Sequence, residues 1–145
     1  MVALRFRWYL VRSPTPVGWR TEHEPAMSHY VTERCVDCRY TYCAVECPVA
    51  AFFEIETPHA MLVIDPDICI DCEACVPACP VNAIWPDHEL PEAYASWKAF
   101  NTEWAKKGTN CTESKDPLPS ARLLDEIQAA EKAKGLAVTE PSKAS

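Results

Sequence analysis

Short apolar runs, three or four residues long, recur along the middle of the chain and are separated by polar, cysteine-rich segments. Residues 56–60, which include Pro58, look like a hairpin loop between the two inner runs. Residues 44–46 and 73–78 can each form a helical turn. The apolar runs are expected to form four strands, at Tyr30–Val31, Phe52–Ile55, Met61–Ile64 and Ala83–Trp85. The order strand, helix, strand, strand, helix, strand predicts an α+β fold.

These elements form an internal repeat over residues 27–89, which we expect to be one βαββαβ core with pseudo-two-fold symmetry. Residues 90–145 change to helical spacing, with an aromatic stripe that includes Tyr94, Trp97 and Trp104. Ser120 is the candidate N-cap of a further helix that ends near Gly135. A core of about 60 residues buries little surface by itself, so we expect this helical extension to pack on it.

Residues 1–26 differ from the rest, being rich in Arg and Trp and broken by proline. Because "MSHYVTERC", from Met27, can begin the fold, we expect a disordered tail or a start site placed too far upstream. A targeting or docking extension is the alternative. Four arginines against two glutamates give this segment a net charge of +2. Because the whole chain has a net charge of −7, the remaining residues carry −9. An acidic body argues against nucleic acid as a partner and favours docking on a basic protein surface.

Nine cysteines in 145 residues leave three chemistries to consider: disulfides, zinc and iron–sulfur clusters. Disulfides fit poorly, because the count is odd and eight of the nine cysteines crowd into two short runs. No apolar signal-peptide region follows the basic N-terminus, so we expect a reducing, cytoplasmic location. No stretch approaches 18 apolar residues, so no membrane span is expected.

The second cysteine run is "CIDCEACVPACP", residues 69–80. A zinc site needs only four ligands, with a spacer loop between its two pairs. The run instead follows the C-x₂-C-x₂-C-x₃-C-P pattern of bacterial iron–sulfur proteins, in which the fourth cysteine binds the other cluster. Proline forces the residue before it into extended geometry, which aims that cysteine away from its predecessors. By the same logic in the first run, one [4Fe-4S] cluster is expected on Cys69, Cys72, Cys75 and Cys47.

The first run, "CVDCRYTYCAVECP" at residues 35–48, has four residues between its second and third cysteines instead of two. Residues 30–119 resemble the bacterial dicluster ferredoxins, most closely the seven-iron kind with one [3Fe-4S] and one [4Fe-4S] cluster. The resemblance rests on the cysteine spacing and on "YT", "CPV", "LVIDPDICIDC" and "KDPLP", at residues 40–41, 47–49, 62–72 and 115–119. The two extra residues separate the seven-iron kind from its eight-iron relatives.

The resemblance implies that Cys38 swings off the cluster and that Cys35, Cys43 and Cys79 hold the [3Fe-4S] cluster. Cys38 bound to iron would instead make this site a second [4Fe-4S] cluster. Cys111 lies outside both runs and is expected to be a structural thiol. The chain departs from the family pattern in two places. Tyr42 stands where an acidic residue is common, which weakens the expectation of proton uptake on reduction, and "PVAAFF" lacks a further cysteine.

The implied function is a one-electron carrier between a reductase and an acceptor enzyme, with no enzymatic activity of its own. The chain shows no Ser/His/Asp arrangement, and three glycines are too few for a phosphate-binding loop. We expect a monomer. Two alternatives remain open: an electron-transfer subunit of a larger oxidoreductase, and an iron or oxidant sensor.

Water is expected to be excluded from the clusters by apolar neighbours, because this exclusion helps to set the reduction potential. The candidates are Val36, Ile64, Ile68, Ile70, Val76, Ile84 and Trp85. The four histidines are scattered and are expected at the surface: His23, His29, His59 and His88.

Overall fold

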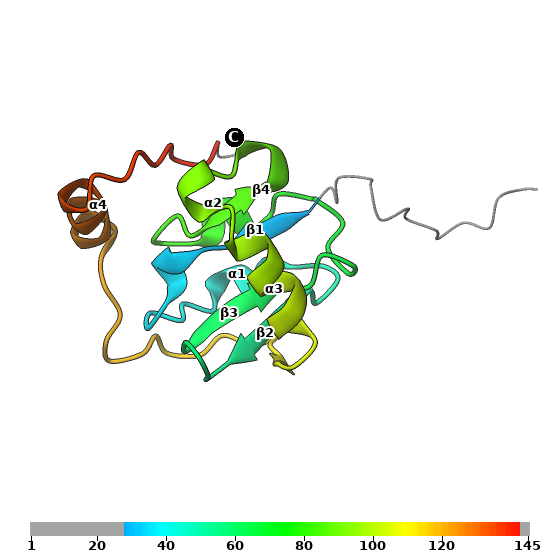
Figure 1. Ribbon diagram of the computed structural model, residues 1–145. Helices are drawn as coiled ribbons and strands as arrows, with labels where there is room; N and C mark the ends of the chain where they lie inside the picture. Colours follow the sequence, from blue (N-terminus) through cyan, green and yellow to red (C-terminus); the bar gives the residue numbers. More distant parts are fainter. Residues whose placement is uncertain (1–27, 143–145) are drawn as a thin grey trace, which may run out of the picture.

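The computed structural model describes residues 28–142; residues 1–27 and 143–145 lie outside the described part, and with them the expected extension 1–26. Helices and short strands alternate along the chain (Figure 1), which confirms the predicted α+β class. The elements are β1 (His29–Val31), η1 (Glu33–Cys35), α1 (Tyr42–Glu46), β2 (Phe52–Ile55), β3 (Met61–Ile64), α2 (Cys75–Ala78), β4 (Ile84–Pro86), η2 (Asp87–Glu89), η3 (Glu92–Tyr94), α3 (Trp97–Ala105), β5 (Thr109–Asn110) and α4 (Leu124–Ala133).

The strands form two small antiparallel sheets. β1 pairs with β4, which places Tyr30 opposite Trp85, and β2 pairs with both β3 and β5. The inner strands β2 and β3 have the predicted bounds, and the outer strands differ from prediction by one residue at their ends. All four residues of β3 are buried, as a continuous apolar run predicts.

Helix α3 packs across β1, β2 and β3 (Figure 1), and its buried Asn101 links the two sheets. The Asn101 Oδ1 accepts backbone N–H bonds from Val31 of β1 at 3.1 Å and from Ile64 of β3 at 2.9 Å. Its Nδ2 donates to the Val31 carbonyl at 2.8 Å. One amide therefore satisfies backbone groups from both sheets that would otherwise be buried without partners. Tyr94, the first aromatic of the predicted stripe, lies in η3 and not in this helix.

The segment between β5 and α4 runs beside the first cysteine loop, and it corrects one prediction. Ser120 is not an N-cap, because its hydroxyl donates to the carbonyl of Asp37 at 2.6 Å. Helix α4 begins at Leu124 instead. The N–H of the preceding Leu123 donates to the carboxylate of Glu126 at 2.9 Å, which satisfies one group at the start of the helix.

Arg34, which is only 1% exposed, ties the first half of the chain to α4 and the C-terminal segment. Its guanidinium donates to Glu131 at 2.7 and 2.8 Å and to Glu140 at 2.7 and 2.8 Å. Glu131 also accepts the hydroxyl of Tyr94. The hydrogen bond from Arg34 lowers the pKa of Glu140 to about 2. Paired, charge-assisted hydrogen bonds of this kind are among the stronger polar contacts in proteins.

Candidate metal centre

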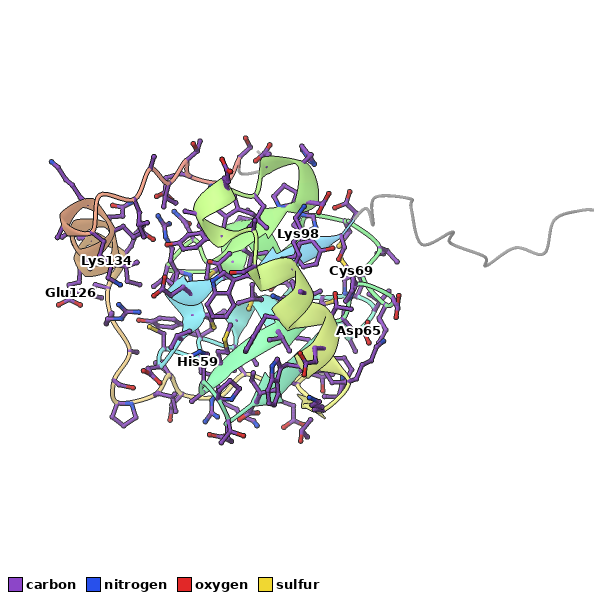
Figure 2. All side chains as sticks on the ribbon, in the orientation of Figure 1. His59, Asp65, Cys69, Lys98, Glu126 and Lys134 are labelled. Atoms are coloured by element: carbon purple, nitrogen blue, oxygen red, sulfur yellow. The ribbon has the colours of Figure 1, made fainter. Side chains whose placement is uncertain are left out.

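Four cysteines from both runs line one apolar pocket, and we call them the outer group: Cys47, Cys69, Cys72 and Cys75. Cys47 follows α1, and the other three lie in the loop before α2 and at its first residue. Figure 2 places Cys69 near the end of β1. The pocket holds ≈ 300 Å³ of space, its open mouth included. Its other lining residues are His29, Val49, Ala51, Phe52, Ile64, Ile70 and Glu73.

The remaining cysteines of the two runs form a second set, which we call the inner group: Cys35, Cys38, Cys43 and Cys79. All four are buried, with exposed fractions of 5, 0, 4 and 5%. Helix α1 contains Cys43, and Cys79 directly follows helix α2. The two helices pack against each other. Each group therefore takes three cysteines from one run and its fourth cysteine from the other run.

The loops around the two groups repeat the same backbone features at matching positions. Six non-glycine residues have positive φ. They form three pairs, because the two members of each pair follow equivalent cysteines of the two runs by the same number of residues. The pairs are Asp37 and Asp71, Arg39 and Glu73, and Ala50 and Asn82. Such conformations cost free energy and concentrate at functional sites. Here they turn each short loop tightly around its cysteines.

The two Cys-Pro cysteines also share a hydrogen-bonding pattern. The backbone N–H of Ala51 donates to the Cys47 Sγ at 3.3 Å, and the N–H of Ala83 donates to the Cys79 Sγ at 3.3 Å. N–H bonds to ligand sulfurs are one of the features by which proteins tune iron–sulfur clusters. The two halves of the repeat thus place a backbone donor at the same sulfur position.

Cys38 differs from the other cysteines because its neighbours come from the C-terminal segment. Its Sγ accepts the backbone N–H of Arg122 at 3.3 Å, and its carbonyl accepts the N–H of Leu118 at 3.0 Å. The side chain is 0% exposed. The longer first loop therefore gives the Cys38 sulfur a hydrogen-bond partner. The equivalent Cys72 is exposed and has no such partner within residues 28–142.

In the inner group, burial is the main influence on the thiols. The pKa of Cys35 is raised to about 12, mainly by burial and also by the nearby charges of Cys79 and Cys38, which together outweigh two backbone hydrogen bonds that lower it. Burial also raises the pKa of Cys43 well above its usual value, with Cys79 and Cys35 adding to the effect. Thiolates this crowded need a positive partner, and a metal centre supplies one by deprotonating the thiols it binds.

In the outer group the thiols respond differently. Burial raises the pKa of Cys75, and the charges of Cys69 and Cys72 add to the increase. Burial also acts to raise the pKa of Cys69. Hydrogen bonds from the His29 side chain and from the backbone of Asp71 outweigh it and lower this pKa to about 7. Cys69 therefore becomes a thiolate more readily than Cys75 does.

The donor set fits iron–sulfur chemistry. Thiolates are the ligands of such clusters, and the outer group presents four of them around one apolar pocket with a backbone N–H already directed at Cys47. Apolar walls and N–H bonds to sulfur are the features by which proteins set the potential of a bound cluster.

Comparison with known proteins gives the same chemistry. The family described as 4Fe-4S binding domain matches residues 62–85. The chain is 45% identical over 91 residues to ferredoxin-1 of Caulobacter vibrioides, covering 63% of this chain and 77% of that protein. It is 46% identical over 98 residues to a ferredoxin of Rickettsia felis, covering 66% of this chain and 84% of that one. The chain belongs to the ferredoxin family.

As a ferredoxin it is an iron–sulfur electron carrier and not an enzyme, and it binds a [4Fe-4S] cluster. Within residues 28–142, no helix is long and apolar enough to cross a membrane.

The structure of this ferredoxin corrects two expectations about the surroundings of the cysteines. His29 was expected at the surface but is 1% exposed and lines the outer pocket, because it lies in β1 opposite Pro86 of β4. His23 lies outside the described residues. Ile68 and Ile70 were expected to exclude water from the clusters, yet they are 36 and 59% exposed, although Ile70 also lines the outer pocket. The two isoleucines project from the loop that carries the outer cysteines.

Other expectations about this ferredoxin agree with the structure. Ile64, Val76, Ile84 and Trp85 are buried. Cys111 is buried apart from the two groups, with its Sγ 3.7 Å from the carbonyl of Glu113. Sequence reasoning missed the role of Asn101 as a link between the sheets, and its only signal was a polar residue on the predicted apolar face.

Proposed function

We propose that this ferredoxin carries electrons one at a time through one [4Fe-4S] and one [3Fe-4S] cluster. The outer group, Cys47, Cys69, Cys72 and Cys75, holds the four-iron cluster. Cys35, Cys43 and Cys79 hold the three-iron cluster. The observation that carries the proposal is the placement of Cys47 around one pocket with three cysteines of the opposite run. The cysteine spacing by itself also predicts that the fourth cysteine of each run binds the cluster held by the other run.

Cys38 stays off iron in this proposal. Its support is the protein partner that the sulfur already has, the N–H of Arg122 at 3.3 Å, together with the anchoring of its carbonyl by Leu118. Arg39, the next residue, has a φ of 45° and begins the longer loop. The alternative, Cys38 on iron, would make the inner site a second four-iron cluster.

The core is proposed to be a βαββαβ unit, residues 27–89, with pseudo-two-fold symmetry, and residues 90–145 form the extension that covers it. The element order, the paired positive-φ residues and the two equivalent N–H···S bonds at Cys47 and Cys79 support this symmetry. Residues 1–26 would then add nothing to the core.

A bound cluster accepts one electron and later releases it, and the chain controls where this exchange occurs. Cys72 is the exposed ligand of the outer group, so the outer cluster lies nearest to a docking protein. Ile70 is exposed beside it, and Tyr42 and Val45 are exposed on α1. We propose that reductase and acceptor enzymes dock here, through these apolar side chains and the acidic body of the protein.

The proposed protein is a cytoplasmic monomer, and the alternative of a permanent enzyme subunit predicts co-purification with larger chains. Size-exclusion chromatography of the isolated protein separates the two, since only a subunit would elute with partners or aggregate when separated from them.

The test of function is reversible electron transfer. Anaerobically purified protein is reduced with dithionite, freed of excess reductant and mixed with oxidised cytochrome c. We expect the cluster absorbance to bleach on reduction, then to recover while about two electrons per chain, one from each cluster, pass to the haem protein. Protein stripped of iron with a chelator is the control and should transfer none. Absence of acid-labile sulfide, or bleaching that cytochrome c does not reverse, would show that the proposal is wrong.

A further inference from the structure

His29 is the one histidine of the described residues that is buried against the cysteines. It lies in β1, is 1% exposed, and lines the pocket of the outer group. Neither ring nitrogen has an aligned hydrogen bond to any group in residues 28–142. Burying an imidazole without partners is costly, and a buried polar group left unsatisfied in a native fold calls for an explanation, which a bound ligand can provide.

Two acceptors face this ring. The Nδ1 atom lies 2.9 Å from Oδ1 of Asp71, although not in the alignment of a hydrogen bond. His29 and Cys69 line the same pocket, and the ring lies close enough to the thiol to help lower the pKa of Cys69. A carboxylate and a thiolate can only accept hydrogen bonds, whereas a protonated ring nitrogen of His29 can donate one.

The equivalent position beside the inner group has no such donor. The backbone of His29 hydrogen-bonds Cys69, the first cysteine of the second run, and the backbone of Leu62 hydrogen-bonds Cys35, the first cysteine of the first run. His29 and Leu62 are therefore counterparts in the two halves. Only the outer site has a side chain at this position that can donate to sulfur.

We propose that His29 is a positioning residue for the four-iron cluster: it donates a ring N–H to the Sγ of Cys69 and so raises the reduction potential of that cluster alone. A hydrogen bond to a ligand sulfur withdraws electron density from the cluster and stabilises the form that holds the extra electron. Asp71, whose Oδ1 lies 2.9 Å from the Nδ1 atom, orients the ring. This inference rests on the ligand assignment proposed above for the outer group.

The test compares reduction potentials of the clustered proteins by protein-film voltammetry at one fixed pH. His29→Leu reproduces the counterpart Leu62, and His29→Gln keeps a side-chain N–H. We expect His29→Leu to lower the reduced fraction of the four-iron cluster at least tenfold at a given potential, a negative shift of ~59 mV for one electron. His29→Gln should shift it less, and the three-iron potential should stay in place.

His59→Leu is the matched control. His59 packs against Trp97 and Phe100, and Figure 2 shows it well away from Cys69. It should leave both potentials unchanged. An unshifted four-iron potential in His29→Leu, or equal shifts of both clusters, overturns the inference while leaving the proposed function intact. Wild-type protein without a four-iron signal overturns the proposed function itself.

A second measurement needs no variant, in case His29→Leu does not assemble its clusters. Wild-type protein with ¹⁵N-labelled histidine is reduced and examined by pulsed electron paramagnetic resonance. We expect a ¹⁵N coupling to the four-iron cluster that persists in His59→Leu and is lost in His29→Gln, because no labelled imidazole then lies beside the sulfur. Absence of any ¹⁵N-histidine coupling in the wild type overturns the hydrogen bond.

Discussion

The inner and outer cysteine groups arise from one repeated motif, yet the chain encloses them differently. Each inner cysteine is at most 5% exposed, whereas in the outer group Cys72 is exposed and Cys47 and Cys69 are half-buried. Residues 115–122 make the difference, because they run along the first loop and bond to it. The backbone N–H groups of Leu118 and Arg122 donate to Cys38, and the Ser120 hydroxyl donates to the Asp37 carbonyl. The Arg122 carbonyl accepts the Tyr40 hydroxyl, and Thr41 is paired with the backbone of Lys115.

The contrast shows how a short insertion can change a metal site. Two additional residues let the loop reach the C-terminal segment, which then provides Cys38 with a partner and covers the site. The second loop lacks the insertion and leaves its first two cysteines, Cys69 and Cys72, nearer to solvent. One site would thus be protected, and the other would be positioned to exchange electrons at the surface.

The largest expected effect comes from removing the crossing cysteines. Cys79→Ala should remove the inner cluster and leave the reduced four-iron signal recognisable, and Cys47→Ala should do the reverse, because each serves the opposite run. Electron paramagnetic resonance of both variants measures this. Since a cluster joins the two halves of a small core, either variant can also fail to fold. Loss of the same cluster in both variants would contradict the distinction between the groups.

Arg34→Met should destabilise the protein by about 3 kcal/mol, because it leaves the buried carboxylate of Glu131 without its cation. Chemical denaturation followed by loss of cluster absorbance measures the change. The double variant Arg34→Met/Glu131→Gln should recover most of it, since no buried charge then remains unpaired. A double variant as unstable as the single one would show that the packing of Arg34 on Trp85 matters more than its charge.

Thr41→Val should destabilise the cover of the inner group by about 2 kcal/mol. The buried Thr41 hydroxyl donates to the Lys115 carbonyl at 2.9 Å and accepts its N–H at 2.6 Å. We expect faster loss of the three-iron signal in air, with the four-iron cluster unchanged. Thr102→Val is the control, because that hydroxyl bonds the carbonyl of Lys98 on an exposed helical face. Equal lability in both variants would rule out a protective cover.

Glu140→Gln should cost about 1 kcal/mol, a value reduced by the partial exposure of this carboxylate. The hydrogen bond from Arg34 lowers the pKa of Glu140 to about 2. Its stabilisation is therefore present above the unfolded value of about 4.5 and is lost only as pH falls from there towards 2. Unfolding free energies of wild type and variant should differ equally at pH 8 and pH 5. A difference that shrinks between these values would contradict the lowered pKa.

Cys38→Ala should have the smallest effect. It removes one N–H···S bond, to Arg122, worth about 1 kcal/mol, and it should keep both clusters and both spectroscopic signals. Iron content before and after the substitution measures this. Loss of the inner cluster in Cys38→Ala, together with its retention in Cys79→Ala, would show that the ligands of this site are assigned wrongly.

Features close together in the sequence were predictable, and features formed between distant segments were not. The apolar runs gave β2 and β3 their bounds because alternation and turn residues act locally. The burial of His29 depends on β4, more than fifty residues away, and its polarity suggested the surface. Ser120 resembled a cap because sequence cannot show that its hydroxyl bonds Asp37. Asn101 and Arg34 were likewise missed, since their partners lie in remote strands and helices.

The most direct test of the difference between the two groups is the iron content and electron paramagnetic resonance of anaerobically purified protein. We predict about seven irons per chain, a three-iron signal in the oxidised protein and a four-iron signal that appears on reduction. About eight irons with no three-iron signal would contradict the inner site as described, and zinc without inorganic sulfide would contradict both sites.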